Sequence, residues 1–362
     1  MRSHWLLMMI HGVVLVMAGL LAGAQPTAPS AGLGQFSYAQ PKMGTIFQLI
    51  LWAPDQKSAD DAAEAAWPRI DQLNKTLSDY DPDSELNQLC RRTDHGPMAE
   101  PVRVSDDLYE ILEDSIEAAR LSDGAFDITV GPLTRLQRQA RKTGKLPDQA
   151  ELRQAMQRVG WRYLRLIPES RRAQLLHEKM QLDVGGIAKG FTSDKVVTLL
   201  REKGITRALC GAAGDIATGD PPPGRPDWRI AIQSLADPEH VSDYVRIHNY
   251  GISTSGDTYR SAIVDGKRYS HIIDPRTGLG LTHRIGVTTV APKGVVADWT
   301  ATAISVLGPE KGLEMIERLD GAAARVVTLD ENEKEKVYES ERFRQFLLTR
   351  GVTSGAATAP VH

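Results

Sequence analysis

Apolar residues recur along this chain with two different periods. Several stretches have helical spacing or continuous apolar character that predicts helices, at residues 58–77, 105–122, 151–159 and 297–308. Shorter apolar or alternating runs predict strands at residues 46–52, 163–167, 208–216, 228–233 and 245–249. Helices and strands are mixed without regular βαβ alternation, and hairpins join several strands. The pattern therefore predicts an α+β fold with mixed, largely antiparallel sheets flanked by helices.

The composition along the chain suggests where the ordered part begins and ends. Residues rich in Gly, Pro, Ala and Ser precede the first predicted strand, and a low-complexity stretch ends the chain. We expect a linker at 25–41, one ordered unit at 42–345 with two lobes at 42–160 and 161–345, and a disordered tail at 346–362. Within the ordered unit, Ser58 and Ser84 are expected to cap the helices that follow them, and Pro68 implies a kink in the first helix.

The first 24 residues have the pattern of a secretion signal. Arg2 and His4 precede an apolar stretch at 5–21, and Ala22-Gly23-Ala24 offers the small residues that a signal peptidase reads. We expect cleavage after residue 24 and a soluble protein in the periplasm. The alternative is a retained N-terminal anchor in the inner membrane, because the apolar stretch approaches the length that spans a bilayer.

Charge and cysteine content exclude some classes of partner. A formal net charge of -3, a pI near 6.3 and the lack of a basic cluster argue against nucleic acid as a partner. The two cysteines, Cys90 and Cys210, are too few for a disulfide scaffold or a zinc cage. They could form one disulfide, but two buried, unpaired thiols are the favoured interpretation.

A glycine-rich turn at residues 182–191 (LDVGGIAKGF) is the stretch around which we expect the chain to be organised. An alternating run ending at Met180 and Leu182 predicts a strand before it, and helical spacing begins after it at Ser193. The first N–H groups of a helix are unpaired and attract anions, so a phosphate would suit this junction. Asp183 adds an acceptor or metal ligand and Lys189 a cation. A plain tight turn with Lys189 in solvent remains the alternative, and neither the dinucleotide fingerprint nor the Walker pattern is matched.

Other segments offer polar groups in apolar surroundings. Asp127 lies between Phe126 and Ile128 and must find hydrogen-bond donors or face a cavity. His271 lies close to a strand end after a hairpin predicted at Asp265-Gly266, where a structural histidine is the more common case.

Asp298 and Thr302 stand one helical turn apart and offer the hard oxygen ligands that Mg²⁺ prefers. The alternative is that Asp298 caps the helix and Thr302 bonds back to its own helix.

Taken together, separated motifs resemble one known family. They occur in this order: Met43-Gly44-Thr45, Tyr80-Asp81-Pro82, Ser84-Glu85-Leu86, Gly124-Ala125-Phe126-Asp127, residues 183–190, Thr254-Ser255-Gly256, residues 271–278, and Ala297-Asp298 with Thr302. From about Met43 to Leu319, the sequence resembles the FAD:protein FMN transferase (ApbE, thiamine-biosynthesis lipoprotein) family. The resemblance agrees with the α+β fold and implies that the flavin lies between the two lobes.

The resemblance implies a Mg²⁺-dependent transferase that cleaves FAD and attaches FMN by a phosphoester bond to Ser or Thr of a partner protein, with release of AMP. The implied partners are flavin-carrying subunits of membrane redox complexes. Carried over by position, the residues that line the FAD pocket are Met43, Tyr80, Ala125, Phe126, Asp127, Asp183, Lys189 and Ile272. The implied metal ligands are Asp298, Thr302 and the main-chain carbonyl of Gly186, and His271 is the candidate general base.

The sequence departs from the family pattern at the metal site and the N-terminus. Ala301 stands where some members carry a further metal-ligating acid, and no lipidation cysteine is present near residue 24. Two other functions remain open at this stage: a periplasmic pyrophosphatase that hydrolyses FAD to FMN and AMP, and a non-catalytic protein that stores FAD.

Overall fold

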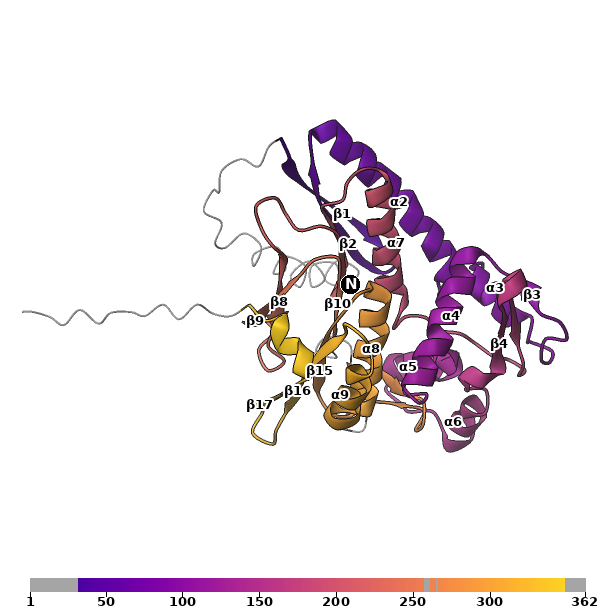
Figure 1. The fold of residues 1–362 in the computed structure, drawn as a ribbon. Coiled ribbons are helices and arrows are strands. Elements are labelled where there is room, and N and C mark those ends of the chain that lie inside the picture. The colour runs from indigo at the N-terminus through magenta and orange to yellow at the C-terminus, as the bar shows by residue number, and fades with distance from the viewer. Residues whose placement is uncertain (1–31, 257–260, 265, 349–362) are drawn as a thin grey trace, which may run out of the picture.

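An eight-stranded antiparallel sheet forms the centre of the molecule (Figure 1). The computed structural model describes residues 32–256, 261–264 and 266–348. The strand order is β1-β2-β6-β7-β10-β15-β16-β17. These strands are β1 (Gly34–Lys42), β2 (Thr45–Ala53), β6 (Ala208–Ala212), β7 (Asp215–Thr218), β10 (Gly251–Gly256), β15 (Ile285–Ala291), β16 (Ala323–Leu329) and β17 (Glu335–Glu339). This arrangement confirms the predicted α+β fold with antiparallel sheets.

Helices cover one face of this sheet and a small second sheet covers the other. The helices on the first face are α2 (Gln56–Leu77), α7 (Ala188–Glu202) and α8 (Gly294–Leu307), and α9 (Pro309–Glu317) packs against α8. On the second face, Trp228 and Val245 belong to the paired strands β8 (Trp228–Gln233) and β9 (Val241–Ile247). They pack with Phe343 against Ile50 and Ile216 of the large sheet. Both faces of the central strands are therefore buried, whereas the edge strands β1 and β17 stay largely exposed.

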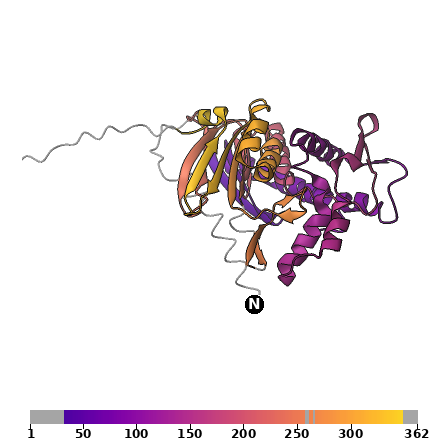
Figure 2. The ribbon, with the colours of Figure 1, turned by 90° about the horizontal axis from the view of Figure 1, so that it is seen from below.

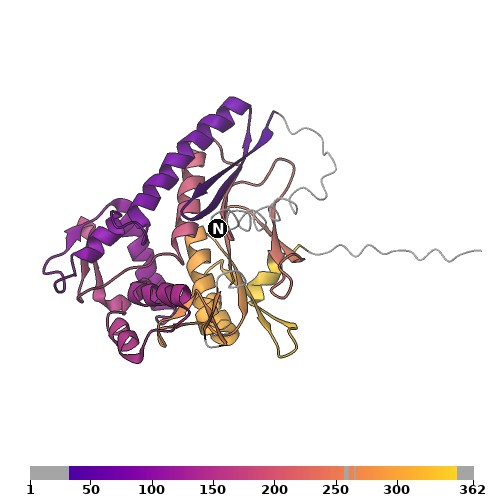
Figure 3. The ribbon, with the colours of Figure 1, turned by 180° about the vertical axis from the view of Figure 1, so that it is seen from behind.

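A mostly helical part of the chain lies to one side of the large sheet (Figure 1, Figure 3). It contains α3 (Glu85–Arg91), α4 (Asp106–Leu121), α5 (Gly131–Thr143) and α6 (Gln149–Met156), with the short 3₁₀ helix η1 (Ile128–Val130) and a sheet of β3 (Val102–Arg103), β5 (Arg172–Leu175) and β4 (Leu164–Ile167). Ile111 and Leu112 of α4 share one apolar core with Ile304 of α8 and Val287 of β15. The view from below shows this part beside the sheet rather than over it (Figure 2).

The predicted division near Gly160 does not match a boundary of the large sheet. Strand β2 comes from the expected lobe 42–160 and β1 mostly from the expected linker 25–41, whereas the other strands of the same sheet come from 161–345. The helical part is instead an insertion between α2 and α7.

Of the two helix caps predicted from the sequence, one is present and the other is not. Ser84 caps α3, as predicted, by accepting a hydrogen bond from Asn87 N, and Ser105 caps α4 in the same way. The prediction that Ser58 caps α2 is wrong: the helix begins at Gln56, and the Asp55 carboxylate accepts from Ser58 N at 2.7 Å. Pro68 lies inside α2, as expected.

Two of the predicted strands are wrong in their extent. Met180 and Leu182 are buried, but residues 180–182 form no strand, and the partner of β4 is β5, which ends at Leu175. The run 208–216 is a hairpin of β6 and β7, because the chain turns at Ala213, whose φ is 56°.

The expected linker and tail are ordered where the structure describes them. The linker prediction is wrong from Gly34 onward, because β1 pairs with β2 along its whole length. The tail prediction is wrong for residues 346–348, since Arg246 N donates to Phe346 O and Leu348 N donates to Tyr244 O. The predicted signal peptide and the rest of the tail lie outside the described residues.

Two further expectations concern cysteines and a hairpin. Cys90 and Cys210 are both buried and free, which confirms the favoured interpretation. The predicted hairpin exists as β11 (Ser261–Val264) paired with β12 (Lys267–Ser270), although Asp265 itself is not among the described residues.

Within the part of the chain that the structure describes, no helix has the length and apolar character needed to span a bilayer.

Candidate active site

The glycine turn leads directly into α7, and α7 crosses α8 at a point of very close approach. A Cβ atom on Gly190 would overlap the carbonyl oxygen of Gly294, the first residue of α8, and would lie 2.8 Å from the Cβ of Asp298. The Gly190 N–H donates to Asp298 Oδ2 at 2.9 Å. The missing side chain therefore lets the carboxylate of α8 reach the first turn of α7.

The same crossing brings Gly186 to Thr302. A Cβ atom on Gly186 would lie 2.9 Å from Thr302 Oγ1 and 3.3 Å from the Phe126 ring. Phe126 in turn packs near Trp299 of α8, with ring centroids 6.3 Å apart. The structure thus brings together Gly186, Asp298 and Thr302, the residues that the family resemblance implies as metal ligands, and places Phe126 beside them.

Lys189 lies between two buried carboxylates. Its Nζ is 2.5 Å from Asp215 Oδ2 and 3.9 Å from Asp298 Oδ2. Ser253 donates to the other Asp215 oxygen at 2.5 Å. Burial raises the pKa of Asp298, and the nearby Asp215 carboxylate raises it further, while Lys189 acts in the opposite direction. A cation close to Asp298 would therefore stabilise its ionised form.

Asp194 fixes the start of α8 relative to α7. Its two carboxylate oxygens accept from Gly294 N at 2.8 Å and Val295 N at 2.9 Å, so a residue of α7 caps α8. This contact and the Gly190–Asp298 hydrogen bond hold the two helices in one register. The positions of the site residues on α7 and α8 are consequently coupled.

A second cluster surrounds Asp183, just before the glycine turn. Asp183 Oδ1 accepts from Gly185 N at 2.8 Å, and Arg138 Nη2 lies 3.4 Å from Asp183 Oδ2 and 2.5 Å from Asp79 Oδ2. Burial, and then the charge of Asp183, raise the pKa of Asp79 to about 6, although Arg138 opposes the rise. The Arg138 guanidinium lies 4.0 Å from the centroid of the Tyr80 ring, which is 76% exposed. Arg138 therefore connects the Tyr80 loop to the glycine turn.

The remaining expected site residues have varied surroundings. Met43 lies at the β1–β2 turn, where its sulfur is 3.6 Å from Thr192 Oγ1 of α7. Ala125 and Ile272 are buried in the same core as Phe126. His271 follows β12 and is partly buried.

Asp127 meets the structural expectation for a buried acid. It accepts from Thr129 N, Thr129 Oγ1 and Trp161 N at 2.8, 2.7 and 2.9 Å. Burial raises the pKa of this carboxyl, and those hydrogen bonds moderate the rise. Its side chain thus stabilises η1 and the chain at Trp161.

The donor set around Gly186 fits a hard divalent cation. Asp298 offers a buried carboxylate, Thr302 a hydroxyl, and Gly186 a main-chain carbonyl. No group of three His, Cys, Asp or Glu side chains in the described residues is arranged to hold a metal. One carboxylate, one hydroxyl and one carbonyl suit Mg²⁺, which is often held by one or two carboxylates and completes its octahedron with water and substrate phosphates.

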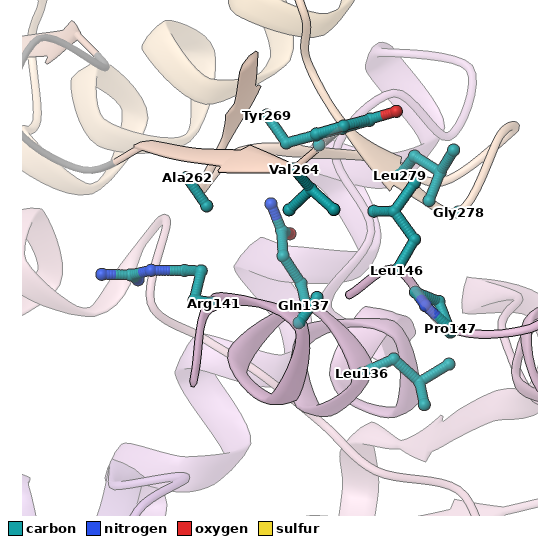
Figure 4. A pocket seen from close by; sticks show the side chains of 12 residues that line it. Leu136, Gln137, Arg141, Leu146, Pro147, Ala262, Val264, Tyr269, Gly278 and Leu279 are labelled. Atoms are coloured by element: carbon teal, nitrogen blue, oxygen red, sulfur yellow. The ribbon is translucent and has the colours of Figure 1, made fainter. Parts of the chain in front are cut away.

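A small apolar pocket lies elsewhere, between α5 and the β11–β12 hairpin (Figure 4). Leu136, Val264 and Leu279 line it from three separate segments. None of the residues expected to bind FAD or the metal is among the described residues that line it. This pocket is therefore separate from the site at the α7–α8 crossing.

Sequence reasoning missed Arg138, Asp79, Asp215 and Ser253. Asp215 had a usable signal, because it is an acid at the end of a run of small residues that follows Leu209. Ser253 pairs directly opposite Asp215 in the β7–β10 ladder, which no local pattern reveals. Arg138 lies on α5 among other basic and polar residues, which give it no distinguishing signal in the sequence.

This fold, with oxygen ligands and a lysine gathered at a helix-initiating glycine turn, is the arrangement of an enzyme that acts on a phosphate-bearing substrate. The chain belongs to the ApbE family, whose model matches residues 43–326. It is 32% identical to an FAD:protein FMN transferase of Klebsiella pneumoniae, over 93% of this chain and 96% of that protein. A protein of the same name from Escherichia coli K12 is also 32% identical, over 85% of this chain and 88% of its own length.

Solved structures agree with this assignment. The flavin transferase ApbE from Vibrio cholerae superposes with a TM-score of 0.77 at 29% identity, covering 87% of this chain and all of that one. The apo form of the flavinyl transferase ApbE from Pseudomonas stutzeri also gives 0.77, at 28% identity, covering 88% of this chain and 98% of that one. The family resemblance of the sequence and the α+β fold are both confirmed.

Proposed function

We propose that this protein is an FAD:protein FMN transferase that cleaves the pyrophosphate of FAD and joins FMN to a Ser or Thr hydroxyl of a partner protein. The observation that carries the proposal is the convergence of Gly186, Asp298 and Thr302 beside Lys189 at the start of α7. The names of the two relatives given above point to the same reaction.

In the proposed reaction, the acceptor hydroxyl oxygen attacks the phosphorus of the FMN half. A new phosphoester bond forms, the bond between that phosphorus and the AMP oxygen breaks, and AMP leaves with the bonding electrons. Lys189 and the N–H groups at the start of α7 bind and orient the phosphates. Bound at Asp298, Thr302 and Gly186, Mg²⁺ would supply positive charge for the phosphoryl oxygens.

His271 is our candidate for the base that takes the hydroxyl proton. We expect His271→Ala to lower the transfer rate by roughly 10²–10⁴-fold, which is the usual contribution of general-base assistance. FAD binding should persist, because the base acts on the acceptor and not on FAD. Stopped-flow transfer assays and FAD titration would measure the two effects, with the exposed His283→Ala as the matched control. Full activity in His271→Ala would refute this role.

Arg138 is expected to support flavin binding by fixing Tyr80, whose exposed ring is suited to stack on the isoalloxazine. Arg138→Met removes the cation from the Tyr80 ring and leaves Asp79 and Asp183 without their shared partner. We expect the Kd for FAD to rise about tenfold. Fluorescence titration with FAD would measure it, and Lys142→Met, an exposed change on the same helix, should leave the Kd unchanged. Equal affinities in the two variants would contradict the role of Arg138.

The partner is proposed to be a flavin-carrying subunit of a membrane redox complex, and the enzyme to act in the periplasm. Incubation of the purified protein with FAD, Mg²⁺ and a periplasmic extract should produce one newly fluorescent protein band and an equal amount of AMP. Rapid AMP release without any acceptor would instead indicate a pyrophosphatase, and binding without AMP a storage protein. Edman sequencing of the exported protein should start at Gln25, and an intact Met1 would contradict signal cleavage.

A further inference from the structure

The ion pair between Lys189 and Asp215 is the tightest charged contact beside the proposed metal ligands. Lys189 Nζ is 2.5 Å from Asp215 and 3.9 Å from Asp298, so both carboxylates are within ion-pairing distance of the same ammonium. The two acids are almost fully buried, with 5% and 3% of their surface exposed. Neither carboxylate can therefore rely on water for its solvation.

The charges of these three groups do not balance. Two carboxylates face one ammonium, so one negative charge is in excess when both acids are ionised. If the ammonium moved fully onto Asp298, it would neutralise the group that the cation needs. The distance between Lys189 and Asp298 therefore bears directly on how well a metal can bind.

Asp215 is held rigidly enough to decide where the ammonium lies. Ser253 donates to its second oxygen at 2.5 Å, and the two residues are direct partners in the antiparallel ladder of β7 and β10. Ser253 itself is 1% exposed. A central strand pair of the sheet thus fixes the carboxylate, whereas Lys189 has a long and flexible side chain.

We propose that Asp215 is a positioning residue that holds the Lys189 ammonium away from Asp298 and so keeps the Asp298 carboxylate available to a divalent cation. The inference rests on the proposed metal site at Gly186, Asp298 and Thr302. It also assigns a role to Asp215, at the start of β7, in a site where Ala301 contributes no charge.

The test uses the full-length protein without FAD and measures Mn²⁺ affinity by calorimetry. We expect Asp215→Asn, which keeps the size and one acceptor oxygen, to weaken Mn²⁺ binding about tenfold or more. The double variant Asp215→Asn with Lys189→Met should regain the affinity of Lys189→Met alone, because the competing ammonium is gone. Ser253→Ala should weaken binding less than Asp215→Asn, since it frees the carboxylate without removing it.

A crystal structure of metal-free Asp215→Asn supplies a second readout, in which Lys189 Nζ should lie within hydrogen-bond distance of Asp298. Wild-type affinity in Asp215→Asn would overturn the proposal. A loss of Mn²⁺ affinity that persists in the double variant would also overturn it, because Asp215 would then be a direct ligand. The same holds if Asp215→Asn loses affinity while Lys189 stays away from Asp298, because the lost charge alone would then be the cause. Wild-type protein that binds no Mn²⁺ would overturn the metal site itself, and this inference with it.

Discussion

Asp298→Ala is expected to abolish metal-dependent FMN transfer. The change removes the carboxylate of the proposed metal site, and one hydroxyl and one carbonyl would hold Mg²⁺ too weakly at low millimolar concentrations. A bound cation contributes several kcal/mol of transition-state stabilisation, so we expect a rate loss of roughly 10³-fold or more. Transfer assays across a Mg²⁺ titration would measure it.

Asp298→Asn separates the charge from the packing. The amide can still accept the hydrogen bond from Gly190 N, which the carboxylate accepts at 2.9 Å, so α7 and α8 should remain in contact. This variant should therefore fold normally and yet lose Mg²⁺-dependent FMN transfer as fully as the alanine variant. Unchanged transfer rates at low millimolar Mg²⁺ in either variant would rule out the metal site.

Two threonines of α8 give a matched control for the same site. Thr302 Oγ1 approaches Gly186, whereas Thr300 Oγ1 bonds back to Val296 O at 2.7 Å in its own helix. Thr302→Val should weaken Mg²⁺ binding, and Thr300→Val should not. Equal effects of the two changes would mean that the Thr302 hydroxyl is no ligand.

The sequence predicted best those elements whose pattern is set by local burial. The amphipathic period of α4 and the apolar run of β2 appear almost where they were expected, because each of these elements buries its apolar residues in a continuous core. β1 was missed because it is an edge strand with few apolar residues, among them Phe36 and Tyr38, and its order comes from pairing with β2.

The segment before the glycine turn shows the opposite error. Met180 and Leu182 alternate like a buried strand, but the backbone of the segment bonds to the Cys90 side chain and to η1 instead of to a neighbouring strand. Leu182 N donates to the Cys90 sulfur at 3.3 Å, and Asp183 N donates to Ile128 O at 2.7 Å. Burial alone produced the alternation there, so the period could not identify a strand.

Some contacts between site residues follow from local spacing in the sequence, and others depend on the tertiary fold. Asp298 and Thr302 could be paired from the sequence because helical spacing places them one turn apart. The contact of Arg138 with Asp79, and that of Lys189 with Asp215, join segments that only the tertiary fold brings together. Ion pairs between segments so far apart in the chain follow no regular spacing, so the sequence alone does not reveal them.

Gly190→Ala is expected to destabilise the protein, although alanine normally favours a helix over glycine by up to about 1 kcal/mol. The added methyl group would overlap the backbone of Gly294 and lie 2.8 Å from Asp298 Cβ, so α8 must move away from α7. Overpacking of this kind costs about 1–3 kcal/mol, and here the obstacle is backbone, which cannot rotate aside. Because α8 carries Asp298 and Thr302, Mg²⁺ affinity should fall with stability.

Denaturant unfolding would measure the change in the free energy of unfolding, and calorimetry the metal affinity. Gly211→Ala is the control. Gly211 is a buried glycine of β6, and a Cβ atom there would lie 3.5 Å from Ile216 Cγ1, which is an ordinary van der Waals contact. It should alter the free energy of unfolding little and leave Mg²⁺ binding intact. If Gly190→Ala proved as stable as the unsubstituted protein and bound Mg²⁺ equally well, the two helices would not need their close approach to form the site, and the geometry on which the proposed activity depends would be wrong.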